Sequence, residues 1–443
     1  MVQTSAPKDT ENLGHKRVLA IALPIVISNA TVPILGAVDT GVIGQMGEAA
    51  PIGAVGIGAI ILTSIYWIFG FLRMGTVGLV SQALGQNDRD EMDALLSRVL
   101  MIGLASGFML ILLQIPIFAL AFMVSPASNE VESLARDYMV IRVFSAPAMI
   151  SLYGLTGWLI AQERTRGVLV IQLWMNGLNI GLNFLFVLEF GWGIQGVASA
   201  SLIAEWTGFA LAVWLCRDGF RSGAWKVWGR VFEKTRLVRM ALVNSDILVR
   251  SVLLQAAFVS FLFLGGDLGD VPLAANQILL QFIYITSYAL DGFAFAAETL
   301  VGQAMGAKNR ARVRRSAYLT SLWGGIIVMC LAASFWLGGQ ALVDLMATSE
   351  DVRAEASKYL PWMIAAPVLG AAAWMLDGIF IGATRSADMR NMMAVSFVVY
   401  LACLMILLPA FGNHGLWASL ILFFVARGVT LGLRYPALER AVA

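Results

Sequence analysis

Asp39 stands in an apolar run, where its chemistry is easiest to define. Residues 36–41 read GAVDTG, and no Lys or Arg lies within one helical turn of the carboxylate. A carboxylate in apolar surroundings without a nearby cation is stabilised by taking up a proton, which is what a reversible proton carrier requires. Pro24 and Pro33 precede it in the same run, and a proline inside a helix kinks it, so this segment could bend when Asp39 changes charge. The alternative interpretation is a carboxylate solvated at the outer end of its segment.

Three asparagines share one helical face further along the chain. Asn176, Asn179 and Asn183 are spaced i, i+3 and i+7. Three amides that faced lipid without hydrogen-bond partners would cost much free energy, so they must face other helices or a wet cavity. One interpretation is hydrogen bonding that holds helices together. The other is an oxygen-rich shell around Asp39 that hydrogen-bonds it or coordinates a cation, and Ser201 could join that shell.

Eight further charged residues stand out inside apolar segments. Each costs at least about 2.5–3.5 kcal/mol on insertion scales, so each is a candidate functional group or half of a structural ion pair. Arg73 has no partner at helical spacing, and Glu205 is a candidate partner for it. Asp246 and Arg250, spaced i, i+4, can neutralise each other. The six in the second half form either a charge-compensated polar network that fixes packing or a site for substrate or protons: Asp246, Arg250, Asp291, Glu298, Asp377 and Arg427.

Enzymatic chemistry has no support in this sequence. The two histidines, His15 and His414, have no ligand-spaced partners, and the three cysteines are far apart in apolar text. The sequence contains no GxxxxGK[ST] motif for nucleotide binding. We therefore expect no catalytic site, no metal and no cofactor, and no ATP hydrolysis by this chain.

The elements that must position these residues are membrane-spanning helices. The chain has 443 residues, of which 59% are hydrophobic and only 13% charged, about half the charge of a typical soluble domain. Irregular backbone cannot face lipid, so an all-α polytopic membrane protein is expected. Twelve apolar segments qualify: 18–43, 52–82, 94–124, 138–161, 166–188, 194–216, 241–264, 272–304, 316–346, 359–382, 391–409 and 415–436.

The distribution of cations predicts the orientation of these spans. Alternate connections and both termini carry 23 Lys and Arg, whereas the opposite connections carry three. By the positive-inside rule both termini are cytoplasmic, which requires an even number of spans.

The sequence also repeats itself at an offset of 221 residues. Residues 79–89 match 300–310, and residues 155–164 match 376–385. Each repeat holds six spans, so the two lobes share an orientation and are related by an axis along the membrane normal, as in secondary transporters. The expected organisation is an N-tail 1–16, an N-terminal lobe 17–216, a basic cytoplasmic linker 217–240, a C-terminal lobe 241–436 and a C-tail 437–443. Trp225 and Trp228 suggest that the linker lies on the anionic inner leaflet.

The whole chain resembles the MATE (multidrug and toxic compound extrusion) transporters, and among them the DinF-type branch. The resemblance rests on LPI at 23–25, VDT at 38–40, GFLRM at 70–74, VSQALG at 80–85, LDGFA at 290–294 and LDGIFIGATR at 376–385. It implies the V-shaped MATE fold and export of apolar or cationic compounds against an inward H⁺ or Na⁺ flux. It also implies that Asp39 is the coupling carboxylate and Pro24 a bending point.

The family's ion-site pair in the fifth span corresponds to Asn179 and Asn183. An acidic residue of the NorM-type branch is replaced here by Ser251, which favours H⁺ over Na⁺ coupling. The expected partners are small drugs, toxic organic cations or amphiphiles, and membrane lipids, with no nucleic acid, and the chain is expected to act as a monomer in the bacterial inner membrane. The alternative function is a flippase for lipid-linked intermediates, which would need a basic cavity for pyrophosphate headgroups.

Overall fold

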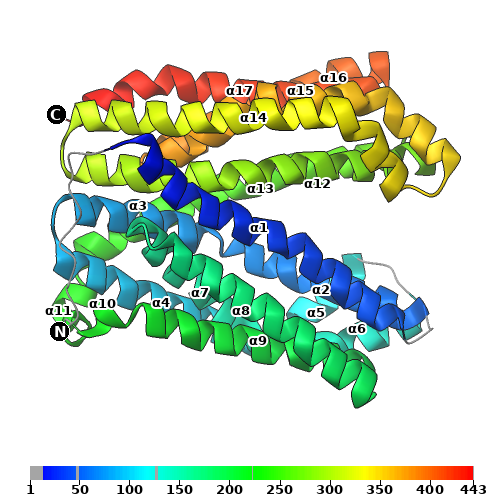
Figure 1. Cartoon of the computed structure of the whole chain (residues 1–443), viewed down its shortest axis with the longest axis horizontal. Helices are drawn as coiled ribbons and strands as arrows, with labels where there is room; N and C mark the ends of the chain where they lie inside the picture. The colour runs from blue at the N-terminus through cyan, green and yellow to red at the C-terminus, as the bar shows by residue number, and fades with distance from the viewer. Residues whose placement is uncertain (1–12, 46–48, 125–127, 222, 443) are drawn as a thin grey trace. The chain divides into compact units, whose positions relative to one another are not determined.

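The computed structural model describes residues 13–45, 49–124, 128–221 and 223–442, and the described chain is helical throughout its regular structure (Figure 1). Twelve of its helices or helix pairs are long and apolar enough to cross a membrane. The expectation of an all-α polytopic membrane protein with twelve spans is therefore confirmed.

The first six spans combine uninterrupted and broken helices. The second span is divided by a turn at Phe69 and Gly70, and the fourth contains a short 3₁₀ segment, η1. The elements are α1 (His15–Gly44), α2 (Ala49–Ile68), α3 (Phe71–Gly85), α4 (Arg89–Leu112), α5 (Gln114–Val124), α6 (Asn129–Arg142), η1 (Val143–Ser145), α7 (Ala146–Ala161), α8 (Thr165–Asn183), the π-helical η2 (Phe184–Glu189) and α9 (Gly193–Leu215).

Short helices form the connection to the second half, and each later span is a single helix. The connection contains α10 (Arg217–Arg221), η3 (Ala224–Lys226) and α11 (Trp228–Val231). The six spans that follow are α12 (Lys234–Gly266), α13 (Asp270–Gly306), α14 (Arg310–Met346), α15 (Glu350–Gly382), α16 (Ser386–Phe411) and α17 (Asn413–Arg440).

The repeat of 221 residues is visible in the backbone. Among the described residues, four non-glycine positions have φ between 50° and 62°: Asn87, Glu163, Lys308 and Thr384. They form two pairs, 87 with 308 and 163 with 384, each separated by the repeat length. Each pair ends a helix in the left-handed conformation that closes helix C-termini. The two halves therefore share the geometry of their turns as well as their sequence.

The helix that follows the first pair of turns is capped in the same way in both repeats. The Asp88 carboxylate accepts a hydrogen bond from the backbone N–H of Glu91, at 3.1 Å. The Asn309 side chain accepts one from the N–H of Arg312, at 3.0 Å. Asp and Asn are both preferred N-cap residues, so the cap is retained while its charge changes.

The chain forms two compact units whose boundaries differ from those of the expected lobes. The first unit is residues 24–252, and the second unit is residues 1–23 together with 253–443. Both boundaries fall inside helices, between Leu23 and Pro24 in α1 and between Val252 and Leu253 in α12. The expected second lobe begins at residue 241, but the first 19 of the 33 residues of α12 group with the first unit.

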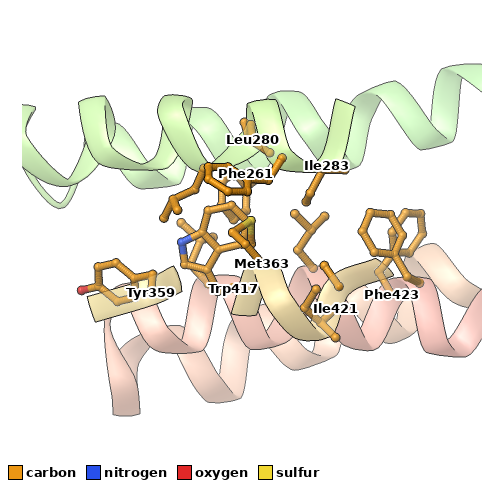
Figure 2. Close-up of a cluster of buried hydrophobic side chains, with 14 of the residues drawn as sticks. Phe261, Leu280, Ile283, Tyr359, Met363, Trp417, Ile421 and Phe423 are labelled. Carbon is orange, nitrogen blue, oxygen red and sulfur yellow. The ribbon is translucent and has the colours of Figure 1, made fainter. Parts of the chain in front are cut away.

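Each unit has its own apolar core. In the second unit Phe261, Leu280, Met363 and Trp417 point toward one another from α12, α13, α15 and α17 (Figure 2). The core of the first unit gathers side chains of α2, α6 and α7 with neighbours on α1, α3 and α9, among them Tyr66 and Tyr138.

Candidate transport and coupling site

Asp39 lies in α1, and its side chain is outside the part of the structure that is described. The two prolines that precede it, Pro24 and Pro33, lie inside this helix, which runs without interruption to Gly44. The boundary between the two units falls directly before Pro24. Proline has no backbone N–H, so the helical hydrogen bond is missing at Pro24. This position coincides with the boundary between the two units in α1.

The first asparagine of the shared face of α8, Asn176, is hydrogen-bonded to α1. Asn176 donates from Nδ2 to the Thr31 hydroxyl at 2.8 Å. Its Oδ1 accepts from Gln172, one turn earlier, at 3.0 Å. Asn176 is buried. Its amide therefore does not face lipid, and protein groups supply its hydrogen-bond partners.

The other two asparagines bind to each other and to α9. Asn183 donates to Asn179 Oδ1 at 2.9 Å, and Asn179 donates to the Ser201 hydroxyl at 2.8 Å. All three side chains are buried, and Asn183 is 0% exposed. The structure therefore links Asn179, Asn183 and Ser201 by hydrogen bonds, and the asparagine face is turned toward neighbouring helices. Low-dielectric surroundings strengthen such a chain of hydrogen bonds and make a missing partner costly.

Glu205 forms a buried ion pair that sequence spacing did not reveal. Its carboxylate binds the guanidinium of Arg142, which also donates to the Tyr138 hydroxyl at 3.3 Å. The sequence suggested Arg73 as the partner of Glu205, whereas the ion pair seen here is with Arg142, 63 residues away. Arg142 lies within the apolar segment 138–161, and that position was the available signal for it.

Asp377 and Arg427 form a buried ion pair in the second unit. Arg427 Nη2 lies 2.5 Å from Asp377 Oδ2, and the guanidinium packs over the rings of Phe423 and Phe424 at 5.6 and 5.9 Å from their centroids. Both partners are buried. A buried pair with good geometry offsets much of the desolvation cost of its charges, whereas one partner alone would not.

The residues of the expected second-lobe polar network are divided between the two units. Asp246 and Arg250 belong to the first unit, because they precede Val252 on α12. Asp291 and Glu298 belong with Asp377 and Arg427 to the second unit, on α13. Glu298 is 1% exposed, so it is as deeply placed as the ion pair.

A further polar cluster was missed because its members look unremarkable in sequence. Asn276 and Asn413 exchange two amide hydrogen bonds at 2.8 and 3.0 Å, and Trp417 donates to Asn276 Oδ1 at 2.8 Å. Asn276 and Trp417 are both 0% exposed. The cluster joins α13 to α17 within the second unit. Within the described ranges, no group of three His, Cys, Asp or Glu side chains is placed to hold a metal ion.

Comparison with known proteins gives matches along almost the whole chain. A family model described as MatE matches residues 24–185 and 247–406. The DNA damage-inducible protein F of Escherichia coli (strain K12) is 34% identical over 421 residues, covering 94% of this chain and 91% of the relative. A probable multidrug resistance protein NorM of Xanthomonas campestris is 26% identical, covering 95% of this chain and 93% of the relative.

Solved structures match the fold at low sequence identity. The bent form of the Vibrio cholerae MATE transporter VcmN has a TM-score of 0.85 and 19% identity, with 97% of each chain covered. A MATE protein in the straight conformation has a TM-score of 0.86 and 17% identity, with 96% of this chain and 97% of that chain covered.

Proposed function

The chain belongs to the MATE family, and on that premise we propose that it is an antiporter that exports apolar or cationic compounds by alternating access, driven by inward H⁺ flux through Asp39. Membership of this family makes it a multi-pass membrane transporter for multidrug or toxin efflux and not an enzyme. We further propose that it works as a monomer in the inner membrane of a bacterium, with both termini in the cytoplasm.

The observation that carries this proposal is the hydrogen-bonded asparagine face of α8. Asn176 is bound to Thr31 of α1, and spans one and five run in the same direction across the membrane. A helix rises about 1.5 Å per residue, so Asn183 lies about 10 Å beyond Asn176 along α8. Residue 39 lies eight positions beyond Thr31 along α1, at nearly the same level. This shared level supports a response of the asparagine face to the charge of Asp39.

Protonation at Asp39 has a structural element through which it can act. An ionised carboxylate attracts amide and hydroxyl donors, and the donors of the Asn179–Asn183–Ser201 group (the coupling shell) are already ordered by their bonds to one another. A neutral carboxyl loses that attraction. Pro24 and Pro33 supply places where α1 can bend in response.

Proton coupling is favoured over sodium coupling by the chemistry of the shell. Sodium requires several oxygen ligands, and Asn179 Oδ1 already accepts from Asn183. Both shell amides are neutral, so Asp39 would bring the one negative charge among Asp39, Asn179, Asn183 and Ser201. A single carboxylate that gains and loses a proton needs no further ligands.

The flippase alternative draws no support from two of the buried arginines. A pyrophosphate headgroup needs exposed cationic side chains in a cavity. Arg142 and Arg427 are instead each neutralised by a carboxylate in a buried ion pair. We therefore retain the antiporter as the proposed function.

The proposal is tested in proteoliposomes with H⁺ and Na⁺ gradients imposed separately. We expect ethidium transport to follow the pH gradient alone and to be lost in Asp39→Asn, which still inserts and folds. The matched control is Asp344→Asn, an exposed carboxylate in the last turn of α14, which should transport normally. Transport by Asp39→Asn at the wild-type rate would overturn the role of Asp39, and transport driven by the sodium gradient alone would overturn proton coupling.

A further inference from the structure

A cavity of about 560 Å³ lies between α4 and the helices of the connection 217–240. This volume falls within the range of about 300–1,000 Å³ that is typical of small-molecule sites. The coupling shell and the buried ion pairs contribute nothing to it, so the transport proposal gives it no role. Its lining is mainly apolar and aromatic: Ser97, Leu100, Met101, Phe220, Arg221, Trp225, Trp228 and Val231.

A buried arginine of α4 holds the part of the connection that lines this cavity. Arg98 is 2% exposed and donates from Nε to the Val231 carbonyl and from Nη2 to the Arg230 carbonyl, each at 2.7 Å. Its Nη1 donates to Glu91 at 2.7 Å. Arg230 in turn binds Asp88 at 2.6 Å. The connection is thus bound to the start of α4 by charged hydrogen bonds, and the cavity is a built feature of the first unit.

The cavity is continuous with a lipid-facing side of α4. Met101, Phe108 and Leu112 are exposed and spaced i, i+7 and i+11, so they share one face of the helix. In a membrane-spanning helix such a face is covered by acyl chains. Ser97, which is 7% exposed, lies one turn before Met101, and both line the cavity. An acyl chain lying along α4 can therefore extend directly beneath the connection.

The rim of the cavity is positively charged. Arg221 lines it and is exposed, and Lys226 packs over the ring of Trp225 at 5.3 Å from the centroid. Asp218 is the carboxylate beside them, 3.5 Å from Arg221 and 3.9 Å from Arg164. Arg164 and Arg221 thus share one carboxylate, and Lys226 adds a further cation. Half-exposed tryptophans among cations are typical of the headgroup level of a membrane.

We propose that this cavity binds one anionic phospholipid, with an acyl chain between α4 and Trp228 and the phosphate at Arg221 and Lys226. Basic pockets of this kind select anionic headgroups. A zwitterionic lipid would fill the apolar part without satisfying the charge, and a cationic transport substrate would be repelled by the rim. The inference does not depend on the proposed transport function, because its test measures lipid binding alone.

The first test counts retained lipids by native mass spectrometry of the purified full-length chain, titrated with phosphatidylglycerol or phosphatidylcholine. We expect one phosphatidylglycerol to bind most tightly, and Arg221→Ala/Lys226→Ala to weaken that step by about 25-fold, since each surface cation contributes about fivefold. The control Arg315→Ala/Arg434→Ala removes two exposed cations of the second unit and should leave the step unchanged. Equal retention of both lipids, or equal losses in the two double variants, would overturn the proposal.

The second test locates the lipid in the unmodified protein. Phosphatidylglycerol with a photoactivatable diazirine on its acyl chain is cross-linked to the wild-type chain, and the labelled peptides are identified. We expect labelling to be concentrated in residues 97–101 and 220–231. Labelling that is spread evenly over the lipid-facing helices would overturn the assignment. Loss of labelling from this cavity when ethidium is added would also overturn it.

Discussion

Arg239 of α12 donates a hydrogen bond to the Gln82 side chain of α3, with 2.7 Å between Nη2 and Oε1. The repeat gives Gln82 a counterpart in Gln303, which accepts from Arg17 of α1 at 3.0 Å. In both cases the arginine comes from the first span of one repeat and the glutamine from the second span of the other. The two bonds therefore fix the start of each first span to the opposite repeat, within one compact unit each.

Removing either glutamine should loosen the start of its partner helix. A hydrogen bond to a charged group contributes about 1.5–3 kcal/mol, so Gln82→Ala and Gln303→Ala should each lower the thermal midpoint, measured by tryptophan fluorescence in detergent. Gln82→Glu and Gln303→Glu keep an acceptor for the arginine and should unfold near the wild-type midpoint. The control Gln86→Ala removes an exposed glutamine at the end of α3 and should have no effect. Equal midpoints for all three alanine variants would contradict this role.

Hydropathy and the repeat predicted most of the fold, because each span must satisfy its own backbone inside the membrane. The twelve spans follow directly from that constraint. The grouping of residues 234–252 with the first unit could not be read from the same pattern. An apolar run shows that a helix crosses the membrane, but it does not show which neighbours the helix packs against.

The site was predicted unevenly for the same reason. The shared face of Asn176, Asn179 and Asn183 follows from helical periodicity, which acts locally. The pairing of Arg142 with Glu205 depends on how two helices 63 residues apart align, and no local spacing encodes that alignment. Asn276 and Asn413 are single polar residues at helix ends in the sequence, and their mutual bonds appear only after α13 and α17 are packed.

Breaking the Arg142–Glu205 pair on one side should cost more than breaking it on both. Glu205→Gln leaves a buried guanidinium without its counter-charge, a change that typically costs about 3–5 kcal/mol. Arg142→Met/Glu205→Leu removes both charges and should recover much of the loss. Thermal midpoints of the single and double variants measure this difference.

The matched control for that pair is Arg136→Ala. Arg136 binds Glu132 at 3.1 Å on the exposed part of α6, where an i, i+4 pair contributes only about 0.3–0.5 kcal/mol. A loss in Arg136→Ala as large as that in Glu205→Gln would show that burial does not decide the cost.

Two repeat-related glycines should be equally intolerant of a methyl group. A Cβ on Gly157 would lie 2.7 Å from the Arg73 carbonyl oxygen, and one on Gly378 would lie 2.6 Å from the Ala294 carbonyl oxygen. Because backbone cannot move aside cheaply, each alanine variant should lose about 1–3 kcal/mol of stability. Thermal midpoints and the yield of folded protein measure the effect.

Two glycines with open surroundings provide the comparison. Gly177 and Gly325 have no neighbouring heavy atom within 4 Å of a built Cβ, and alanine is the better helix former by about 1 kcal/mol. Gly177→Ala and Gly325→Ala should therefore be neutral or stabilising. If they destabilise as much as Gly157→Ala, close backbone packing is not the cause.

Removing the bond between Asn179 and Ser201 of the coupling shell should change transport more than it changes stability. Ser201→Ala takes one acceptor from Asn179 and should cost about 1 kcal/mol. Asn179→Leu also deprives Asn183 of its acceptor, so it should cost more, because buried polar groups are left without partners. Thermal midpoints of the two purified variants check that order.

The transport readout separates coupling from mere packing. If the shell donates to an ionised Asp39, its loss disfavours the charged carboxylate. The half-maximal pH of ethidium efflux in proteoliposomes should then move upward in Ser201→Ala, while Asn129→Ala, an exposed residue at the start of α6, keeps the wild-type profile. A Ser201→Ala profile that coincides with wild type, at equal amounts of folded protein, would assign the shell to packing alone.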